Sequence, residues 1–139
     1  MVKANTHLHF NGDCADALKF YESCLNGKIT FSITYGELPE GENVPSGFGK
    51  KIMHASFEFG AKQMLTADDA PPGTYSRPQG FHIMLSYDVL AEAERTFSAL
   101  SVNGQVVMPF GKTFWAKGFG ILVDQFGIPW MINCSEPNK

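Results

Sequence analysis

The chain has 139 residues, a formal net charge of −3, and 44% hydrophobic and 13% aromatic residues. A chain of this length buries about two-thirds of the surface that its unfolded form exposes, which suits one compact core or two closely paired half-domains. Its Lys and Arg residues are scattered, so no basic surface for nucleic acid is expected.

The cysteines and the apolar segments indicate the compartment. Cys14, Cys24 and Cys134 are odd in number and lack CxxC spacing, which favours three reduced thiols over a disulfide framework. The first ten residues contain no apolar signal region, and no later apolar run is long enough to span a bilayer. We therefore expect a soluble cytoplasmic protein that binds neither nucleic acid nor membrane.

The first half of the chain predicts a strand, a helix and three further strands. Residues 6–10 alternate two apolar residues with His7 and His9, the pattern of a half-buried strand. Asp13 is expected to cap a helix that has an apolar stripe and ends at Gly27. The next segments are a strand at Lys28–Tyr35, a loop at Gly36–Lys50, and strands at Lys51–Phe59 and Gln63–Ala67. The long loop is either a lid over a pocket or an ordinary surface excursion.

The second half repeats this pattern after a linker at Asp68–Gly80 that is rich in Asp, Pro and Gly. Asp88 is expected to cap its helix, and Gly104 to end it. The inward positions of that helix are Leu90, Ala93, Phe97 and Leu100. The predicted strands are Phe81–Tyr87, Gln105–Phe110, Gly118–Asp124 and Pro129–Cys134.

An internal repeat relates the two halves. The stretch FYESCLNGKITFSI at Phe20–Ile33 returns in degenerate form as FSALSVNGQVVMPF at Phe97–Phe110, with both Asn-Gly pairs aligned. Each copy is predicted as the end of a helix, a glycine stop and a strand. A second echo aligns Phe57–Gly60 with Asp124–Gly127. Each half is therefore predicted as strand, helix, strand, strand, strand.

This order, repeated twice, resembles the vicinal oxygen chelate superfamily, which includes glyoxalase I, bleomycin-resistance proteins, fosfomycin-resistance enzymes and extradiol dioxygenases. The PhnB-like branch is more similar. The resembling segments are HLHFNGDCADALKFY (7–21), YGELPEG (35–41), PSG (45–47), MHASFEFG (53–60) and TFWAKGFGILVDQFGIPWMIN (113–133). The resemblance implies an α+β fold in which two βαβββ modules form a curved mixed sheet around a cavity, commonly completed by dimerisation. We expect a single domain over 1–139, with module 1 at about 1–70, a linker at about 68–80 and module 2 at about 81–135.

Superfamily enzymes hold one divalent metal with ligands from the first and fourth strands of each module, typically two His and two acidic residues. Counted from the turn glycines, Met64 and Met131 occupy the positions where metal-binding relatives place a Glu. A thioether is a poor ligand for hard divalent ions. The resemblance therefore implies that the inherited metal centre is dismantled.

The four histidines, His7, His9, His54 and His82, each lie in a predicted strand. One hypothesis is a replacement metal site made of His82, His54 and one of His7 or His9, because these are ligand types of a tetrahedral zinc site. The hypothesis that we favour is a set of hydrogen-bonded histidines without metal. Neutral imidazole then serves as a general base, or binds an anionic substrate when protonated.

Spacing assigns no carboxylate partner to these histidines. Asp68 and Asp124 follow predicted strands and are expected to form turns, and Glu58 shares a strand face with His54. Trp115 and Phe119, with Phe114, predict either the wall of a pocket or a dimer seam. The candidates for a ligand pocket are His7, His9, His54, Met64, His82, Trp115, Phe119 and Met131.

The leading hypothesis is a homodimeric PhnB-like protein that binds a small molecule and has no obligatory metal. The alternatives are a metal-dependent lyase, isomerase or transferase with a His-based site, and a purely structural dimer with a filled barrel. No catalytic residue is assigned and no cofactor other than a divalent metal is considered. The sequence does not set the substrate, because one such fold carries many chemistries.

Overall fold

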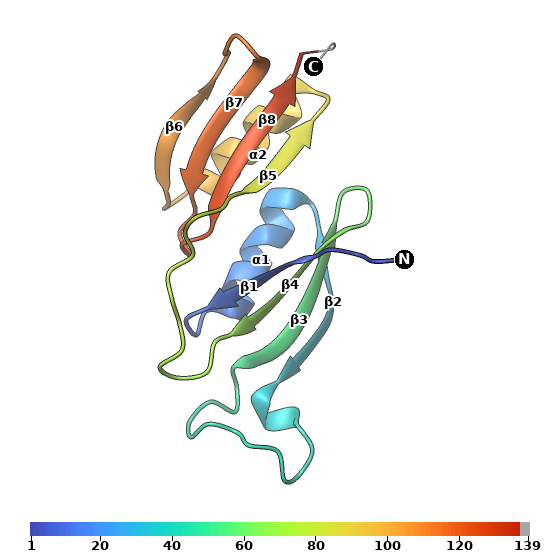
Figure 1. Ribbon diagram of the computed structural model, residues 1–139, viewed down its shortest axis with the longest axis vertical. Helices are drawn as coiled ribbons and strands as arrows, with labels where there is room; N and C mark the ends of the chain where they lie inside the picture. The colour runs from blue at the N-terminus through green and yellow to red at the C-terminus, as the bar shows by residue number, and fades with distance from the viewer. Residues whose placement is uncertain (137–139) are drawn as a thin grey trace. The chain divides into compact units, whose positions relative to one another are not determined.

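The computed structural model describes residues 1–136 and divides the chain into two compact units (Figure 1). Unit 1 covers Met1–Ser76 and unit 2 begins at Arg77. Each unit contains one four-stranded mixed sheet and one α-helix, in the order strand, helix, strand, strand, strand. The predicted α+β fold of two βαβββ modules is therefore confirmed.

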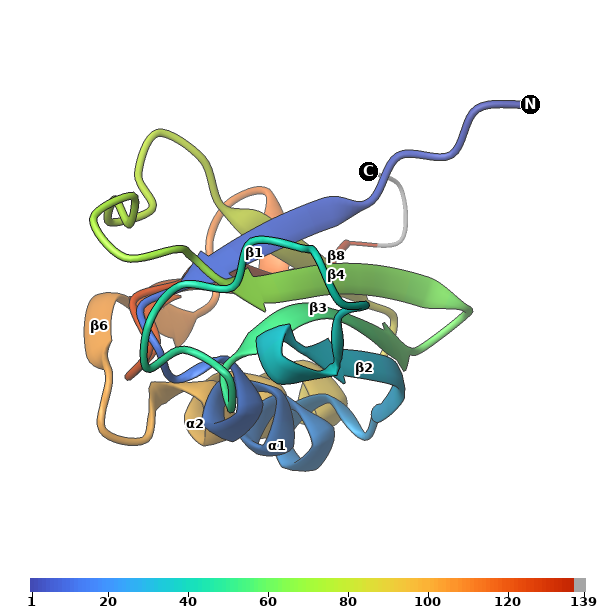
Figure 2. The same ribbon diagram turned by 90° about the horizontal axis from the view of Figure 1, so that it is seen from below.

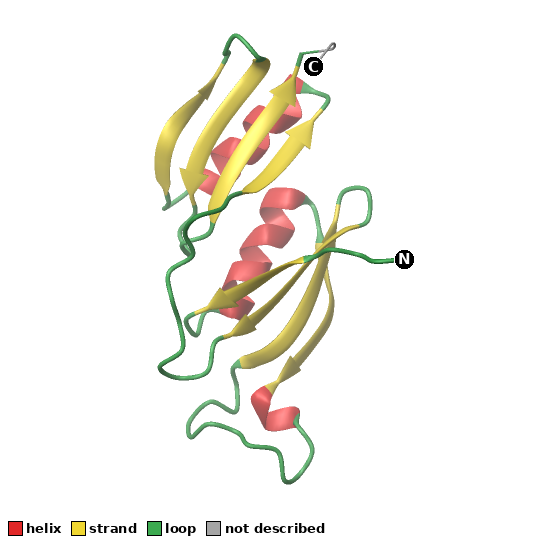
Figure 3. Ribbon diagram, viewed as in Figure 1, coloured by secondary structure: helices red, strands yellow, loops and turns green. Residues whose placement is uncertain are grey.

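In unit 1 the first strand lies at one edge of the sheet, beside the last strand. The strand order is β1-β4-β3-β2, with β1 parallel to β4 and the other neighbours antiparallel (Figure 3). The elements are β1 (Thr6–Phe10), α1 (Cys14–Leu25), β2 (Lys28–Thr34), the short 3-10 helix η1 (Tyr35–Glu37), β3 (Ile52–Phe59) and β4 (Gln63–Asp69).

Unit 2 has the same topology. Its strand order is β5-β8-β7-β6, and β5 is parallel to β8. The elements are β5 (Ile83–Tyr87), α2 (Leu90–Ser101), β6 (Gln105–Gly111), β7 (Ala116–Val123) and β8 (Pro129–Ser135).

The sheet of unit 1 has two chemically different faces. Its apolar residues pack against α1, which covers one face of the sheet (Figure 2). The buried stripe of α1 is Cys14, Ala17, Leu18, Tyr21, Cys24 and Leu25. Leu8, Phe10, Phe57 and Leu65 supply much of the sheet's share of this core. Successive strand residues point to opposite faces. The residues between them therefore lie on the other side, and we call that side the open face: His7, His9, Phe31, His54, Ser56, Thr66 and Asp68.

The Asn-Gly repeat has a structural cause in both units. Asn26 and Asn103 adopt left-handed conformations, with φ of 54° and 57°, and so turn the chain after each helix. A Cβ on Gly27 would lie 2.6 Å from the Phe57 ring, and one on Gly104 would lie 2.5 Å from the Val123 carbonyl oxygen. Only glycine allows the following strand to approach this closely.

The predicted helix caps are not made by the side chains expected to make them. Asp13 occupies the N-cap position of α1, as predicted, but its side chain makes no cap hydrogen bond. The N-cap residue of α2 is Val89 and not the predicted Asp88, and it also makes no side-chain cap hydrogen bond. Asp69 replaces Asp13, because its Oδ1 accepts a hydrogen bond of 2.9 Å from the Cys14 amide. The first turn of α1 is thus satisfied by a residue from the end of β4.

Three further expectations need correction. β4 continues to Asp69, so Asp68 belongs to a strand and not to a turn or linker. His82 precedes β5, which begins at Ile83. Leu90 is 41% exposed and not part of the buried stripe of α2, which contains Ala93, Thr96, Phe97 and Leu100. In contrast, Asp124 forms the predicted turn: its Oδ1 accepts hydrogen bonds from the amides of Phe126 and Ile128.

Cys14, Cys24 and Cys134 are all buried and form no disulfide bond, which allows a test of the core. Burial, reinforced by the charge of Asp69, raises the pKa of the Cys14 thiol. An exposed thiol ionises near pH 8.5 in the unfolded chain, so the free energy of unfolding is expected to fall as the pH rises above about 8.5.

We expect native protein to resist a thiol reagent at pH 8 and guanidinium-unfolded protein to react at three sites. Rapid labelling of the native protein would show that these thiols are not buried.

Among the residues that the structure describes, no helix is long and apolar enough to cross a membrane.

Candidate functional site

A group of polar side chains that contact one another lies on the open face of unit 1. His7 and His9 are two residues apart on β1, so they share a face, as predicted. Parallel pairing of β1 with β4 places Thr66 beside His7 and Asp68 beside His9. We call His7, His9 and Asp68 the His–Asp cluster. It is built by contacts between segments about sixty residues apart in the sequence.

One carboxylate bridges two imidazoles in this cluster. His9 Nδ1 lies 2.8 Å from Asp68 Oδ1, and His7 Nε2 lies 3.1 Å from Asp68 Oδ2. The other ring nitrogen of His7 lies 2.6 Å from the Thr66 hydroxyl. An ionised carboxylate only accepts hydrogen bonds, so both facing ring nitrogens carry protons. The Thr66 hydroxyl then donates to His7 Nδ1, and His9 Nε2 keeps its lone pair.

This arrangement presents His9 to solvent as a proton acceptor. The side chain of His9 is 61% exposed, whereas that of Asp68 is only 16% exposed. Asp68 therefore lies behind the imidazole and fixes its orientation. The chemistry available is proton acceptance or the binding of an acidic group.

His54 extends this site across the sheet. Its ring stacks on that of His7, with centroids 5.8 Å apart and planes at 18°, and it lies 6.2 Å from the ring of Phe31 on β2. β1 and β3 are separated by β4 in the sheet, so the His7 and His54 rings meet above β4. Three of the four histidines are thus brought together in unit 1.

The His–Asp cluster also fits a divalent metal. One ligand atom from each of its three residues lies within 4.8 Å of the others. Two imidazoles and a carboxylate are ligand types that zinc and non-haem iron accept. Thr66, at the second ring nitrogen of His7, makes the kind of contact that orients a metal-bound imidazole. The metal set suggested by the structure is therefore His7, His9 and Asp68, whereas the sequence predicted His54 and His82 as partners.

Sequence reasoning missed Asp68 because β4 was predicted to end at Ala67. A signal was present in the strand period: Met64, Thr66 and Asp68 are two residues apart and so share one face. Extending the strand by two residues would have placed a carboxylate on the face that holds His7 and His9.

The two methionines in the expected acidic positions are not equivalent in the structure. The Asn5 side-chain amide lies 4.0 Å from the sulfur of Met64, whereas Met131 pairs with Met84. The repeat aligns Met84 with His7, and His7 pairs with Thr66. By strand register, the counterpart of Met131 is therefore Thr66 and not Met64. Unit 2 offers thioethers where unit 1 offers an imidazole and a hydroxyl.

The remaining pocket candidates lie in unit 2. Trp115 and Phe119 pack edge to face with centroids 5.5 Å apart, and Phe114 packs on Trp115 at 4.8 Å. Phe119 is buried, while Phe114 is 88% exposed. The role of this aromatic stack as a pocket wall or a dimer seam stays a prediction. His82 lies just ahead of β5 in the same unit.

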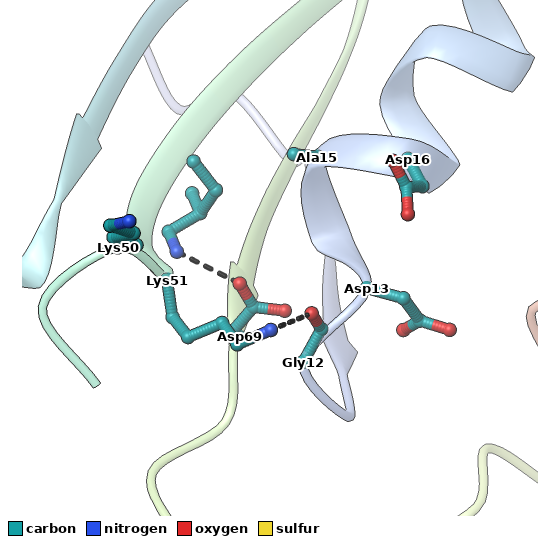
Figure 4. A pocket seen from close by; sticks show the side chains of 8 residues that line it. Gly12, Asp13, Ala15, Asp16, Lys50, Lys51 and Asp69 are labelled. Carbon is teal, nitrogen blue, oxygen red and sulfur yellow. Dashed lines mark hydrogen bonds between the residues drawn. The ribbon is translucent and has the colours of Figure 1, made fainter. Parts of the chain in front are cut away.

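A hollow of about 220 Å³ lies at the start of α1 (Figure 4). The Lys51 ammonium donates a 2.7 Å hydrogen bond to the Gly12 carbonyl, and Asp69 accepts one of 2.8 Å from the Ile52 amide. The Tyr35 hydroxyl donates to the Asp69 carbonyl at 2.9 Å. These bonds tie the two ends of the 36–50 loop to β4 and to the turn before α1, so we interpret the hollow as a structural junction. Whether the loop acts as a lid stays a prediction.

The fold agrees with comparisons to known proteins. The family model of the Glyoxalase/Bleomycin resistance protein/Dioxygenase superfamily matches residues 5–132, so the chain belongs to this superfamily. The predicted superfamily is confirmed.

Two similar proteins cover nearly the whole chain. Protein YjdN of Escherichia coli (strain K12) is 36% identical over 135 residues, 91% of each chain. The crystal structure of protein PA1353 from Pseudomonas aeruginosa is 40% identical, with a TM-score of 0.88, and covers 97% of this chain and 98% of that one. The PhnB protein from Bacillus cereus shares the fold at 24% identity, with a TM-score of 0.78 over 96% of this chain and all of that one.

Proposed function

We propose that this chain is a small-molecule-binding protein of the PhnB-like branch, with no obligatory metal, whose ligand binds on the open face of unit 1. The observation that carries the proposal is the bridging of His7 and His9 by Asp68 at 3.1 and 2.8 Å. The proposal includes the homodimer that the resemblance implies and the cytoplasmic location that the cysteine pattern favours.

In this proposal His9 is the residue that contacts the acidic group of the ligand. Its Nε2 accepts the ligand's proton or, once protonated, donates a hydrogen bond to the resulting anion. Asp68 is a positioning residue, because it acts through the ring of His9 and balances the imidazolium charge. Thr66 and Asp68 together fix the ring of His7, because they engage both of its nitrogen atoms.

A divalent metal at the same cluster is the second candidate function. The observation that favours it is the placement of three ligand atoms within 4.8 Å of one another. His7, His9 and Asp68 would hold the ion, which would supply a Lewis acid to polarise an oxygen atom of the ligand. Thr66 would keep the imidazole of His7 in its ligating orientation.

The two candidate functions predict different anion binding by protein that has been treated with a chelator to remove metal ions. We expect acetate and methylphosphonate to shift the NMR signals of the His9 imidazole in metal-free protein. Asp68→Asn should weaken this binding at least about tenfold, since a hydrogen bond to a charged group contributes about 1.5–3 kcal/mol. Calorimetry should show a similar loss for His9→Gln, which lacks the imidazole that reports binding by NMR. Asp88→Asn, an exposed carboxylate in unit 2, is the matched control and should bind as the unmodified protein does.

The same titration with one equivalent of zinc or manganese decides between the candidates. Anion binding that requires the metal, and calorimetric metal binding that is lost in His7→Ala, would replace the proposal with the metal site. No response of His9 to either anion, with or without metal, would exclude the His–Asp cluster as the ligand site.

A further inference from the structure

Four rings form a continuous row across the open face of unit 1. The ring centroids are 6.2 Å apart from Phe31 to His54, 5.8 Å from His54 to His7, and 4.9 Å from His7 to His9. We call these four residues the ring row. It runs from β2 across β3 and β4 to β1, and the His–Asp cluster forms its end.

The ring row lies beside a polar strip. Strand register places Phe31 beside Ser56, Ser56 beside Thr66, and Thr66 beside His7. The two hydroxyl residues therefore lie between the aromatic end and the imidazole end of the row. Phe31 is 53% exposed, so a large apolar ring faces outward next to groups that bind acids. A flat apolar ring in this position is suited to contact with another ring.

The imidazoles on this face favour an acidic partner. Three imidazoles, those of His7, His9 and His54, accompany one carboxylate, Asp68, and that carboxylate is already shared by two of the rings. The next acidic side chain on this face is Glu58, which pairs with Met64 toward the far end of β4. An acidic ligand at the imidazole end can therefore give its proton to His9 Nε2 and accept a hydrogen bond from that atom in return.

We infer that the open face of unit 1 binds a planar aromatic carboxylate, an inference that rests on the proposed function and names its ligand class. The carboxylate is held by the exposed Nε2 of His9, and the aromatic ring stacks on His54 and Phe31. Ring stacking is worth about 0.5–1.5 kcal/mol beyond area burial, which corresponds to about two- to tenfold in affinity for each ring lost.

The experiment compares benzoate with cyclohexanecarboxylate, which have the same carboxylate and a similar size but differ in planarity. With the full chain in metal-free buffer, we expect calorimetry to show benzoate binding about tenfold more tightly. Phe31→Leu and His54→Leu should each reduce this preference about two- to tenfold. His54→Phe should retain it, because the replacement keeps a ring at the same place.

The control is Phe59→Leu. Phe59 is on β3, but it shares the helix-side parity of Phe57 and packs on that residue with centroids 6.0 Å apart. Its replacement should leave the benzoate preference unchanged. Equal binding of the two acids would overturn the ligand class while leaving the proposed function in place. Failure of both acids to bind would instead overturn the proposed function and this inference with it.

Discussion

Replacement of Asp69 with Leu is expected to lower the free energy of unfolding by about 4 kcal/mol. The side chain is 1% exposed, and one of its oxygens accepts a hydrogen bond of 2.9 Å from the Cys14 amide. Its other oxygen accepts one of 2.8 Å from the Ile52 amide (Figure 4). Leu leaves both amide groups buried without an acceptor, and each costs about 1–3 kcal/mol. Urea unfolding followed by circular dichroism measures the change.

Asp68 provides the matched comparison, because it is the preceding residue on the same strand and faces the opposite side of the sheet. Asp68→Leu should lower stability by about 1 kcal/mol or less, since its histidine partners are solvent-accessible. It should nevertheless abolish the response of His9 to acetate. Asp69→Asn, which retains one acceptor oxygen, gives an intermediate loss if the Leu variant does not fold. Equal destabilisation by Asp68→Leu and Asp69→Leu would show that this division of roles is wrong.

The contrast between these neighbours explains why the sequence predicted the elements better than the site. The alternation in β1 and the apolar stripe of α1 are local patterns, and both were found where predicted. The segment Asp68-Asp69-Ala70-Pro71-Pro72-Gly73 has the composition of a turn. Its first two residues are strand only because β1 pairs with them, a contact that spans about sixty positions of the sequence.

The same limit applies to the helix caps and the ligand positions. Asp13 has the right residue type and location for an N-cap, yet Asp69 reaches the first turn of α1 from another strand. Counting from the turn glycines placed Met64 and Met131 in equivalent positions, whereas pairing with β1 and β5 shifts them apart by two residues. Strand register depends on the partner strand, so counting along one segment does not determine it.

Alanine at the repeated glycines is the second large effect that the structure predicts. In Gly104→Ala the new Cβ would lie 2.5 Å from the Val123 carbonyl oxygen and 3.0 Å from the Asp124 Cα. Both are backbone atoms, so the sheet itself must move, and we expect a loss of about 3 kcal/mol. In Gly27→Ala the nearest atoms are the Phe57 ring at 2.6 Å and the Glu58 carbonyl at 2.7 Å. A side chain can adjust partly, so about 2 kcal/mol is expected.

Gly111→Ala separates this packing effect from the general effect of replacing glycine. Gly111 is in β6, its φ is not positive, and a Cβ there meets nothing within 4 Å. Alanine at this position restricts the unfolded chain, so the change should lie between zero and a gain of about 1 kcal/mol. Urea midpoints in the order Gly111→Ala, Gly27→Ala, Gly104→Ala, from highest to lowest, would support close helix–strand approach as the cause of the repeat. Equal midpoints would indicate that the Asn-Gly pairs recur only because each helix must end in a left-handed turn.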